Sequence, residues 1–284
     1  MAELRHCLFE CSYTDVQKWL EKTDIVVLPM GSTEKHGAHL PVGMDSYTIE
    51  NIVVRACKKA EVPFTRLFPI GYSPHHMGPV GMGSGTMTFA GDTYRKILFD
   101  MAKSMIYHGF NKIVFASVHG SNTKVIEDPL RKLHYETGAF VCWYKPATER
   151  VMGQVAKIIE GPPEETPGWH SGEMETSQML AADESLVHLE LAKKDRAHAP
   201  KWMGPRFSKC DGSATVEFEG LDNIYVPMEH HEYADIAVIG NPFRGSKEKG
   251  IKLFEAQSDH LAAFLNEIKR WKIEGVKRDF PERA

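Results

Sequence analysis

The first buried strand is predicted by Asp24-Ile25-Val26-Val27-Leu28-Pro29-Met30-Gly31, a short run of mostly β-branched residues closed by a proline and a glycine. The run is apolar at consecutive positions instead of alternate ones, which is typical of a parallel strand covered on both faces. Comparable runs occur at residues 111–118 and 139–144, and a weaker one occurs at 65–70. A late run at residues 235–240 is expected to return to the same sheet or to form a hairpin.

Segments with helical periodicity separate these runs. Between residues 45 and 59, apolar residues stand three or four positions apart and share one helix face: Ile49, Ile52, Val53 and Ala56. Further helices are expected at residues 92–108, 124–137, 176–186 and 250–271. The alternation of strands and helices predicts an α/β fold with a mostly parallel sheet and helices on both faces. The Pro- and Gly-rich segment 160–168 is interpreted as a long loop, so residues 1–284 are expected to form a single domain.

The composition is that of an ordinary globular protein. Hydrophobic residues make up 42% of the chain and charged residues 25%, which argues against intrinsic disorder. The formal net charge of −4 lacks the basic excess that favours binding to nucleic acids or anionic membranes. The sequence shows no apolar run of membrane-spanning length and no secretory pattern at its start, so a cytoplasmic location is expected. The five cysteines form no CxxC pair, which argues against a thiolate zinc site or a disulfide framework.

A polar cluster follows the first predicted strand. The segment from Gly31 to Asp45 contains Glu34, His36, His39 and a second carboxylate, Asp45. It stands at the carboxyl end of a strand, where open α/β sheets place their functional sites. Carboxylate and imidazole ligands suit zinc, manganese or ferrous iron, and one carboxylate can bridge two such ions. By itself, a loop rich in His and Glu is more often simply solvated.

Two further polar clusters strengthen the metal interpretation. His119 follows another predicted parallel strand, and neighbouring parallel strands bring their carboxyl ends to the same edge of a sheet. The segment Trp169-His170-Ser171-Gly172-Glu173-Met174-Glu175-Thr176-Ser177 precedes a predicted helix. Helix capping at Thr176 or Ser177 would explain an acidic residue such as Glu175, but it would not explain His170.

The three clusters together resemble the three signature blocks of the creatininase (creatinine amidohydrolase) family. They are Gly31-Ser32-Thr33-Glu34-Lys35-His36-Gly37 with Asp45, then His119-Gly120-Ser121-Asn122, then the block from His170 to Ser177. Order and approximate spacing match over roughly residues 20–265. The resemblance implies a three-layer α/β/α sandwich and a site for two divalent metal ions per subunit. It also implies a homo-oligomer, often a hexamer.

The resemblance also implies roles for individual residues. Glu34 resembles a ligand of one metal and His36 a ligand of the other, with Asp45 bridging the two ions. His119 resembles a further ligand of the first metal. His170 stands where the family has a histidine that shuttles protons. The ions implied are zinc, manganese or iron.

The second block departs from that of creatininase itself. A Tyr-Glu pair follows the histidine there, and its Glu binds the second metal, whereas this chain has Gly120 and Ser121. The departure disfavours creatinine as the substrate. Glu173 is predicted to supply the missing ligand, with Glu175 as the alternative. His39 is expected to contact the metal ligands, or to have a structural role, more readily than to bind an ion itself.

Three further residues are predicted to contact the substrate, and one further group has the composition of a metal site. The predicted substrate contacts are Trp169, Ser121 and His76. For His76 a surface histidine without a role is the simpler alternative, and for Trp169 it is ordinary packing. Glu229-His230-His231-Glu232 has the composition of a metal cluster, but neighbouring side chains point apart in helices and strands. Only a loop could bring these four side chains together.

These observations predict a hydrolase that acts on a small polar substrate without nucleic-acid or membrane partners. Two divalent ions activate water for attack on a carbonyl group. A cyclic amide or formamide is the first expectation, and cleavage of a C–C bond in a keto-inositol ring is the alternative. A non-hydrolytic sugar isomerase or lyase and a binding protein without activity also stay open at this point.

Overall fold

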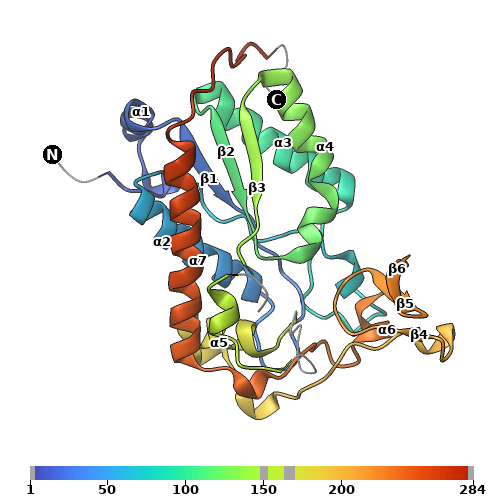
Figure 1. Cartoon of the computed structure of the whole chain (residues 1–284). Helices are drawn as coiled ribbons and strands as arrows, with labels where there is room; N and C mark the ends of the chain where they lie inside the picture. The colour runs from blue at the N-terminus through green and yellow to red at the C-terminus, as the bar shows by residue number, and fades with distance from the viewer. Residues whose placement is uncertain (1–3, 148–152, 163–169, 281–284) are drawn as a thin grey trace.

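The computed structural model describes residues 4–147, 153–162 and 170–280. Its central sheet contains three parallel strands, β1 (Ile25–Pro29), β2 (Lys112–Ala116) and β3 (Phe140–Tyr144), in the order β1-β2-β3. The register pairs Ile25 with Lys112, and Lys112 with Phe140. All three strands point towards the same end of the molecule, and their carboxyl ends meet there (Figure 1).

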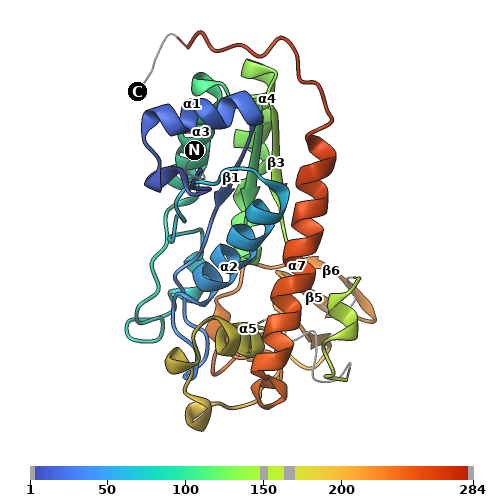
Figure 2. The same cartoon turned by 90° about the vertical axis from the view of Figure 1, so that its left-hand side faces the viewer.

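Helices cover both faces of this sheet. Alternate residues of β1 point to opposite faces, so Ile25 and Val27 pack with α2 (Met44–Ala60) and α7 (Lys247–Ile268). Val26 and Leu28 pack instead with the buried face of α3 (Gly91–His108). α4 (Glu127–Thr137) lies beside α3, and the turned view shows α2 and α7 in front of the strands (Figure 2). The predicted parallel sheet between two helical layers is confirmed.

Two predicted strands do not join the sheet. Residues 65–70 run beside β1, but only isolated parallel bridges form, between Phe64 and Val27 and between Phe68 and Met30. Pro63 precedes this stretch and Pro69 lies within it, and neither has a backbone N–H to donate, which limits regular pairing. Residues 235–240 form neither a strand of the sheet nor a hairpin. Instead Ile239 and Gly240 make short antiparallel bridges with His170 and Asp195.

The start of α5 differs from its prediction. The helix spans Glu173–Asp183, three residues earlier than expected, with Gly172 as its N-cap. Both Glu173 and Glu175 therefore lie in its first turn. α5 packs closely on α7, where Gly250 leaves no room for a Cβ beside the carbonyl oxygen of Ser177. This close packing fixes how α5 is rotated about its axis.

Several elements appear where no element was predicted. α1 (Tyr13–Lys22) begins with a capping box between Ser12 and Asp15. A small antiparallel sheet contains β4 (Phe207–Ser208), β5 (Thr215–Phe218) and β6 (Leu221–Tyr225), and α6 (His230–Tyr233) follows it. The short 3-10 helices are Leu8–Glu10, Pro74–His76, Gly120–Val125, Val155–Lys157, Glu184–Leu186, Leu189–Leu191, Lys201–Met203 and Pro242–Arg244.

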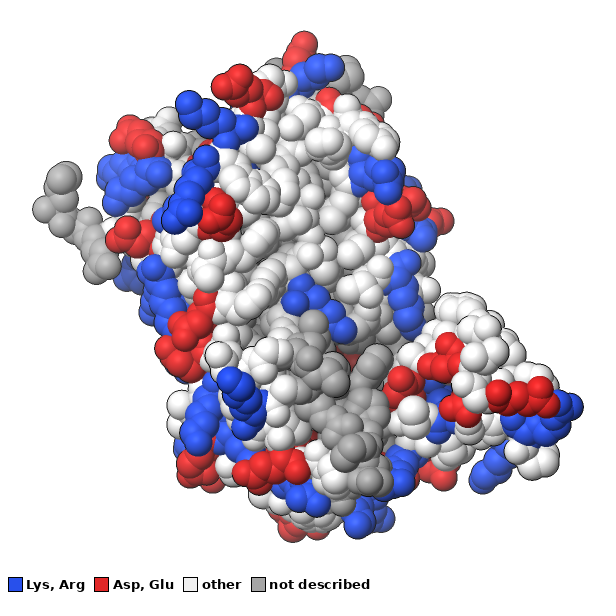
Figure 3. Space-filling view, viewed as in Figure 1, with Lys and Arg blue, Asp and Glu red and all other residues white. Residues whose placement is uncertain are grey.

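The surface carries mixed charges. On the face seen in Figure 3, basic and acidic residues alternate over the molecule and do not gather into one large patch of a single sign. None of the helices in the described part of the chain combines the length and the apolar character needed to cross a membrane.

Candidate metal centre

A cavity of about 240 Å³ lies at the carboxyl end of the parallel sheet. Its walls come from segments that are far apart in the sequence. They are the loops after β1 and β2, the first turn of α5, residues 212–214 before β5, and α6. In Figure 1 these segments surround the region between the lower end of the sheet and the small antiparallel sheet. Ligands of open α/β folds bind at this end of the strands.

The loop after β1 carries two of the predicted ligands towards α2. Gly31 lies so close to Ser46 of α2 that a Cβ would collide with the serine hydroxyl. This contact holds Glu34 and His36 over the first turn of the helix, where Asp45 stands. All three side chains are buried, with exposed fractions of 3% or less.

Glu34, Asp45 and His119 form the first group of possible ligands. Nδ1 of His119 lies 3.2 Å from a Glu34 oxygen and 3.2 Å from Oδ2 of Asp45. The other ring nitrogen, Nε2, lies 2.9 Å from Oγ of Ser73 and 3.2 Å from the carbonyl oxygen of Tyr72. A histidine that donates its Nε2–H to such partners presents the lone pair of Nδ1 to a metal ion.

His36, Asp45 and Glu175 form the second group. Nε2 of His36 lies 3.9 Å from Oδ1 of Asp45 and 3.6 Å from Oε2 of Glu175. Nδ1 of His36 lies 3.1 Å from the carbonyl oxygen of Glu34, which fixes the tautomer with a lone pair on Nε2. Nε2 is buried and makes no hydrogen bond to the residues that the structure describes. Asp45 therefore offers one oxygen to each group, which is the arrangement of a bridging ligand.

The two groups together contain more carboxylates than basic side chains, so they carry an excess of negative charge when no cation is bound. Burial raises the pKa of the Glu175 carboxyl to about 7, and the charge of Asp45 adds to this shift although His36 opposes it. Burial lowers the pKa of His119, but the carboxylates of Glu34 and Asp45 outweigh burial and raise that pKa to about 10. Once His119 has lost its extra proton, three carboxylates and two imidazoles form a donor set that suits two divalent ions.

Glu173, the predicted ligand, does not belong to either group. One oxygen of its carboxylate lies 2.8 Å from Nζ of Lys249, and the carboxylate accepts the backbone N–H groups of Glu160 and Gly161. Successive helical residues are rotated by about 100°, so residues two apart point in nearly opposite directions. Once α5 turns Glu175 towards the cavity, Glu173 must point away from it. This corrects the choice between the two carboxylates.

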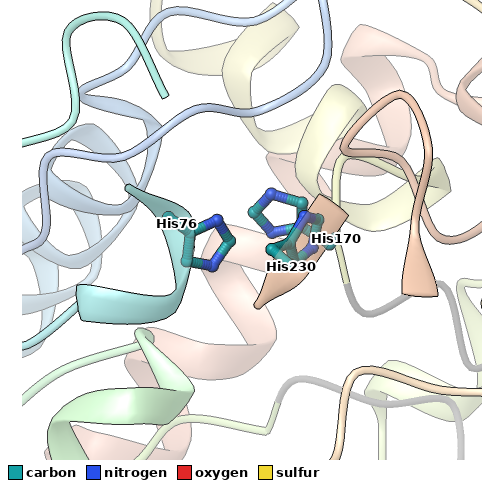
Figure 4. Close-up of side chains that lie close together, drawn as sticks. All are labelled: His76, His170 and His230. Atoms are coloured by element: carbon teal, nitrogen blue, oxygen red, sulfur yellow. The ribbon is translucent and has the colours of Figure 1, made fainter. Parts of the chain in front are cut away.

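Three histidines line the other side of the cavity. Nε2 of His76 lies 3.4 Å from Oε1 of Glu34, and Nδ1 of His170 lies 4.0 Å from the same oxygen. Nε2 of His170 lies 2.8 Å from the carbonyl oxygen of Lys35. His230 completes the cluster, and Figure 4 shows the three rings grouped together from three separate segments. Burial lowers the pKa of all three imidazoles well below the usual value, so they are neutral near pH 7.

The sequence pointed to His230 only as one member of the group Glu229-His230-His231-Glu232 and did not place it at this site. Among the neighbouring acidic and histidine residues of α6, it alone lines the cavity. No local pattern distinguishes it from His231, because the difference depends on how the four-residue helix packs.

The remaining predicted residues lie in different places. Ser121 lines the cavity, and its Oγ lies 3.3 Å from Nε2 of His75. His39 is buried behind the ligands, where its Nε2 lies 3.1 Å from Oγ1 of Thr176. Burial and the nearby His36 lower the pKa of His39 to about 4. Trp169 lies outside the described residues.

The sequence resembles several proteins of known function. It is 27% identical over 261 residues to the 3-dehydro-scyllo-inosose hydrolase of Thermotoga maritima, which covers 89% of this chain and 80% of that protein. It is also 27% identical over 177 residues to the creatinine amidohydrolase of Pseudomonas putida, covering 58% of this chain and 67% of the other. The mycofactocin precursor peptide peptidase of Mycobacterium ulcerans is 27% identical over 254 residues, which cover 87% of this chain and 85% of that protein.

Solved structures share the fold. A crystal structure of creatinine amidohydrolase (creatininase) superimposes with a TM-score of 0.73 and 22% identity, covering 95% of this chain and all of that one. Creatininase structures described as a Zn-Zn type and as an Mn form each give a TM-score of 0.70, at 21% and 20% identity, covering 95% and 94% of this chain. The family model described as creatininase, creatinine amidohydrolase, matches residues 9–265. Because this match covers most of the 284 residues, the chain belongs to the creatininase family of hydrolases.

Proposed function

We propose that this chain is a metal-dependent hydrolase with two divalent ions, which cleaves a bond next to a carbonyl group in a small polar substrate. The observation that carries the proposal is the position of Asp45, whose two oxygens face two separate groups of buried ligands. Glu34 and His119 complete the first group, and His36 and Glu175 complete the second. The unpartnered Nε2 of His36 supports the same assignment.

The donor atoms fit zinc, manganese or iron, because mixed carboxylate and imidazole ligands accept all three. The Zn-Zn and Mn forms of creatininase with the same fold support zinc and manganese in particular. When bound, such a pair of ions lowers the pKa of a water molecule and polarises a carbonyl oxygen. The chain itself supplies the positions of the ligands, a cavity for the substrate and a group that transfers protons.

His170 is suited to move the proton. Its Nε2–H donates to the carbonyl oxygen of Lys35, so the neutral ring presents a lone pair at Nδ1 to the cavity. Nδ1 lies 4.0 Å from Oε1 of Glu34 and therefore stands next to the ligands. A neutral imidazole at this position accepts the proton of the attacking water and passes it to the leaving group.

The substrate is expected to be small and polar. The cavity holds about 240 Å³, and its walls carry carboxylates, imidazoles and Ser121 beside apolar side chains such as Met44, Met174 and Ile239. A cyclic amide or formamide, cleaved at a C–N bond, fits these features. A keto-cyclitol, cleaved at a C–C bond, fits them equally, and the long match to the 3-dehydro-scyllo-inosose hydrolase of Thermotoga maritima specifically favours this second candidate. Both reactions require attack of water at a carbonyl carbon.

Isotope labelling tests the reaction class directly. The protein loaded with Zn²⁺ or Mn²⁺ is incubated with cyclic amides, formamides and keto-cyclitols in ¹⁸O-labelled water, and the products are analysed by mass spectrometry. We expect one ¹⁸O atom in the carboxyl group of the product, because water is a reactant in hydrolysis. Asp45→Ala should be inactive and hold fewer ions. Turnover that yields an isomerised or eliminated product without label would contradict the proposal.

The two acidic residues of α5 should differ in their effect on metal content. Glu175→Gln is expected to reduce bound Mn²⁺ from two ions per chain to about one, because Glu175 faces His36 and Asp45. Glu173→Gln should keep both ions but lower the melting temperature, since it weakens a buried pair with Lys249. Elemental analysis of the purified variants measures the ions, and calorimetry measures the melting temperature. The reverse pattern would restore Glu173 as the ligand.

Metal binding should release protons at pH 7. The pKa of about 10 means that His119 carries a proton in the metal-free protein, and the pKa of about 7 means that Glu175 is partly protonated. Ligands must lose their protons to bind an ion, so the affinity should rise as the pH is raised from 6 to 8. Calorimetric titration with Zn²⁺ in buffers of different ionisation enthalpy measures the release. A binding enthalpy that is the same in all buffers would refute the prediction.

His170→Ala should separate proton transfer from metal binding. We expect a loss of about 10²–10⁴-fold in kcat, the usual range for general acid–base catalysis, with two Mn²⁺ ions retained per chain. His188→Ala is the matched control, because the His188 side chain is exposed and does not line the cavity. Its kcat should equal that of the unmodified protein. Loss of the paired Mn²⁺ ions in His170→Ala would instead identify His170 as one of their ligands.

A further inference from the structure

Another possible metal-binding site lies beside the two groups of ligands proposed for the paired ions. Its candidate ligands are all histidine side chains. His76, His170 and His230 each offer a ring nitrogen, and these nitrogens lie within 4.8 Å of one another. His76 ends a short 3-10 helix, His230 begins α6, and His170 precedes α5. The rings group tightly in Figure 4, with centroids 4.3 Å apart for His76 and His230 and 4.7 Å apart for His170 and His230.

Two ring nitrogens of this cluster lack a hydrogen-bond partner among the described residues. Nδ1 of His76 and Nδ1 of His230 are buried and make no hydrogen bond to any described residue. His170 uses its Nε2–H on the carbonyl oxygen of Lys35, which leaves the lone pair of its Nδ1 open. A buried polar atom without a partner costs about 1–3 kcal/mol. Two such atoms, Nδ1 of His76 and Nδ1 of His230, in one cluster with the open lone pair of His170 indicate an occupant that binds the three rings together.

The nearest charge indicates that this occupant is a cation. Oε1 of Glu34 lies 3.4 Å from Nε2 of His76 and 4.0 Å from Nδ1 of His170. A carboxylate at this distance repels an anion and attracts a positive ion. Three histidines with an open fourth position are also a ligand set that zinc uses in proteins.

We propose that His76, His170 and His230 form a third cation site, which binds ions with a preference for imidazole, such as Zn²⁺, Ni²⁺ or Cu²⁺. This site differs in chemistry from the paired site, where carboxylate oxygens dominate. Mn²⁺ prefers oxygen ligands and binds nitrogen sites more weakly than Zn²⁺, so it should fill the paired site and leave the imidazole site empty.

A regulatory consequence follows, and it rests on the proposed function. An ion at the imidazole site takes up the lone pair of His170 that would otherwise carry the proton. Zn²⁺ beyond two ions per chain should therefore slow hydrolysis, whereas excess Mn²⁺ should not.

Metal counting tests the site without any substrate. The metal-free protein is saturated with Zn²⁺ or with Mn²⁺, freed of unbound ions by gel filtration, and analysed for metal per chain. We expect three Zn²⁺ but two Mn²⁺ for the unmodified protein, and two of either ion for His230→Ala and for His76→Ala. His231→Ala, which changes the adjacent residue of α6, should keep three Zn²⁺ and serves as the matched control.

The outcomes separate this proposal from the proposed function. Saturation of the unmodified protein at two Zn²⁺, or retention of the third Zn²⁺ in both His230→Ala and His76→Ala, would overturn the third site while leaving the paired site intact. Failure of the paired site would instead appear as a protein that binds no Mn²⁺. The two Mn²⁺ ions kept by each variant also show that it is folded, so loss of the third Zn²⁺ cannot result from misfolding.

Discussion

Three carboxylates share one buried cavity, and the arrangement of the rest of the site depends on this concentration of negative charge. Glu34, Asp45 and Glu175 come from a loop, from α2 and from α5. Removing such groups from water costs several kcal/mol for each unpaired charge. The metal-free protein offsets part of this cost with protons, since the pKa of Glu175 is raised to about 7 and that of His119 to about 10. The two divalent ions proposed above would offset it more completely and would use the lone pairs that face inward.

Contacts outside the cavity fix the positions of these carboxylates. Asp45 and Glu175 lie in the first turns of α2 and α5, where the positive end of the helix dipole favours a carboxylate. The rotation of α5 is fixed on its outer side by the contact of Gly250 with α7 and by the pair between Glu173 and Lys249. Glu173 therefore helps to anchor the first turn of α5 on the side that faces away from the cavity, while the contact with Gly250 also holds the helix in place.

The cavity has two walls of different chemistry. One wall carries the oxygen ligands, and the other carries His76, His170 and His230, which are neutral because burial lowers the pKa of each. A substrate between the walls would meet the ions on one side and hydrogen-bonding imidazoles on the other. This arrangement suits a ring with several oxygen atoms, whose carbonyl group must be oriented as well as activated. The same imidazoles are the ligands of the proposed third cation site, where proton transfer and metal binding would compete for His170.

The sequence by itself determined the parallel sheet and its two helical layers, because strand patterns are local. It also predicted that Glu34, His36, Asp45 and His119 lie close together, because polar residues at strand ends share one edge. Only the tertiary structure shows which of the two glutamates of α5 faces the cavity, since that depends on where the helix begins and how it packs on α7. It alone also brought His230 into the cavity, from a segment whose neighbouring histidine stays outside. The physical reason is that helix rotation is set by contacts distant in sequence, which no local pattern records.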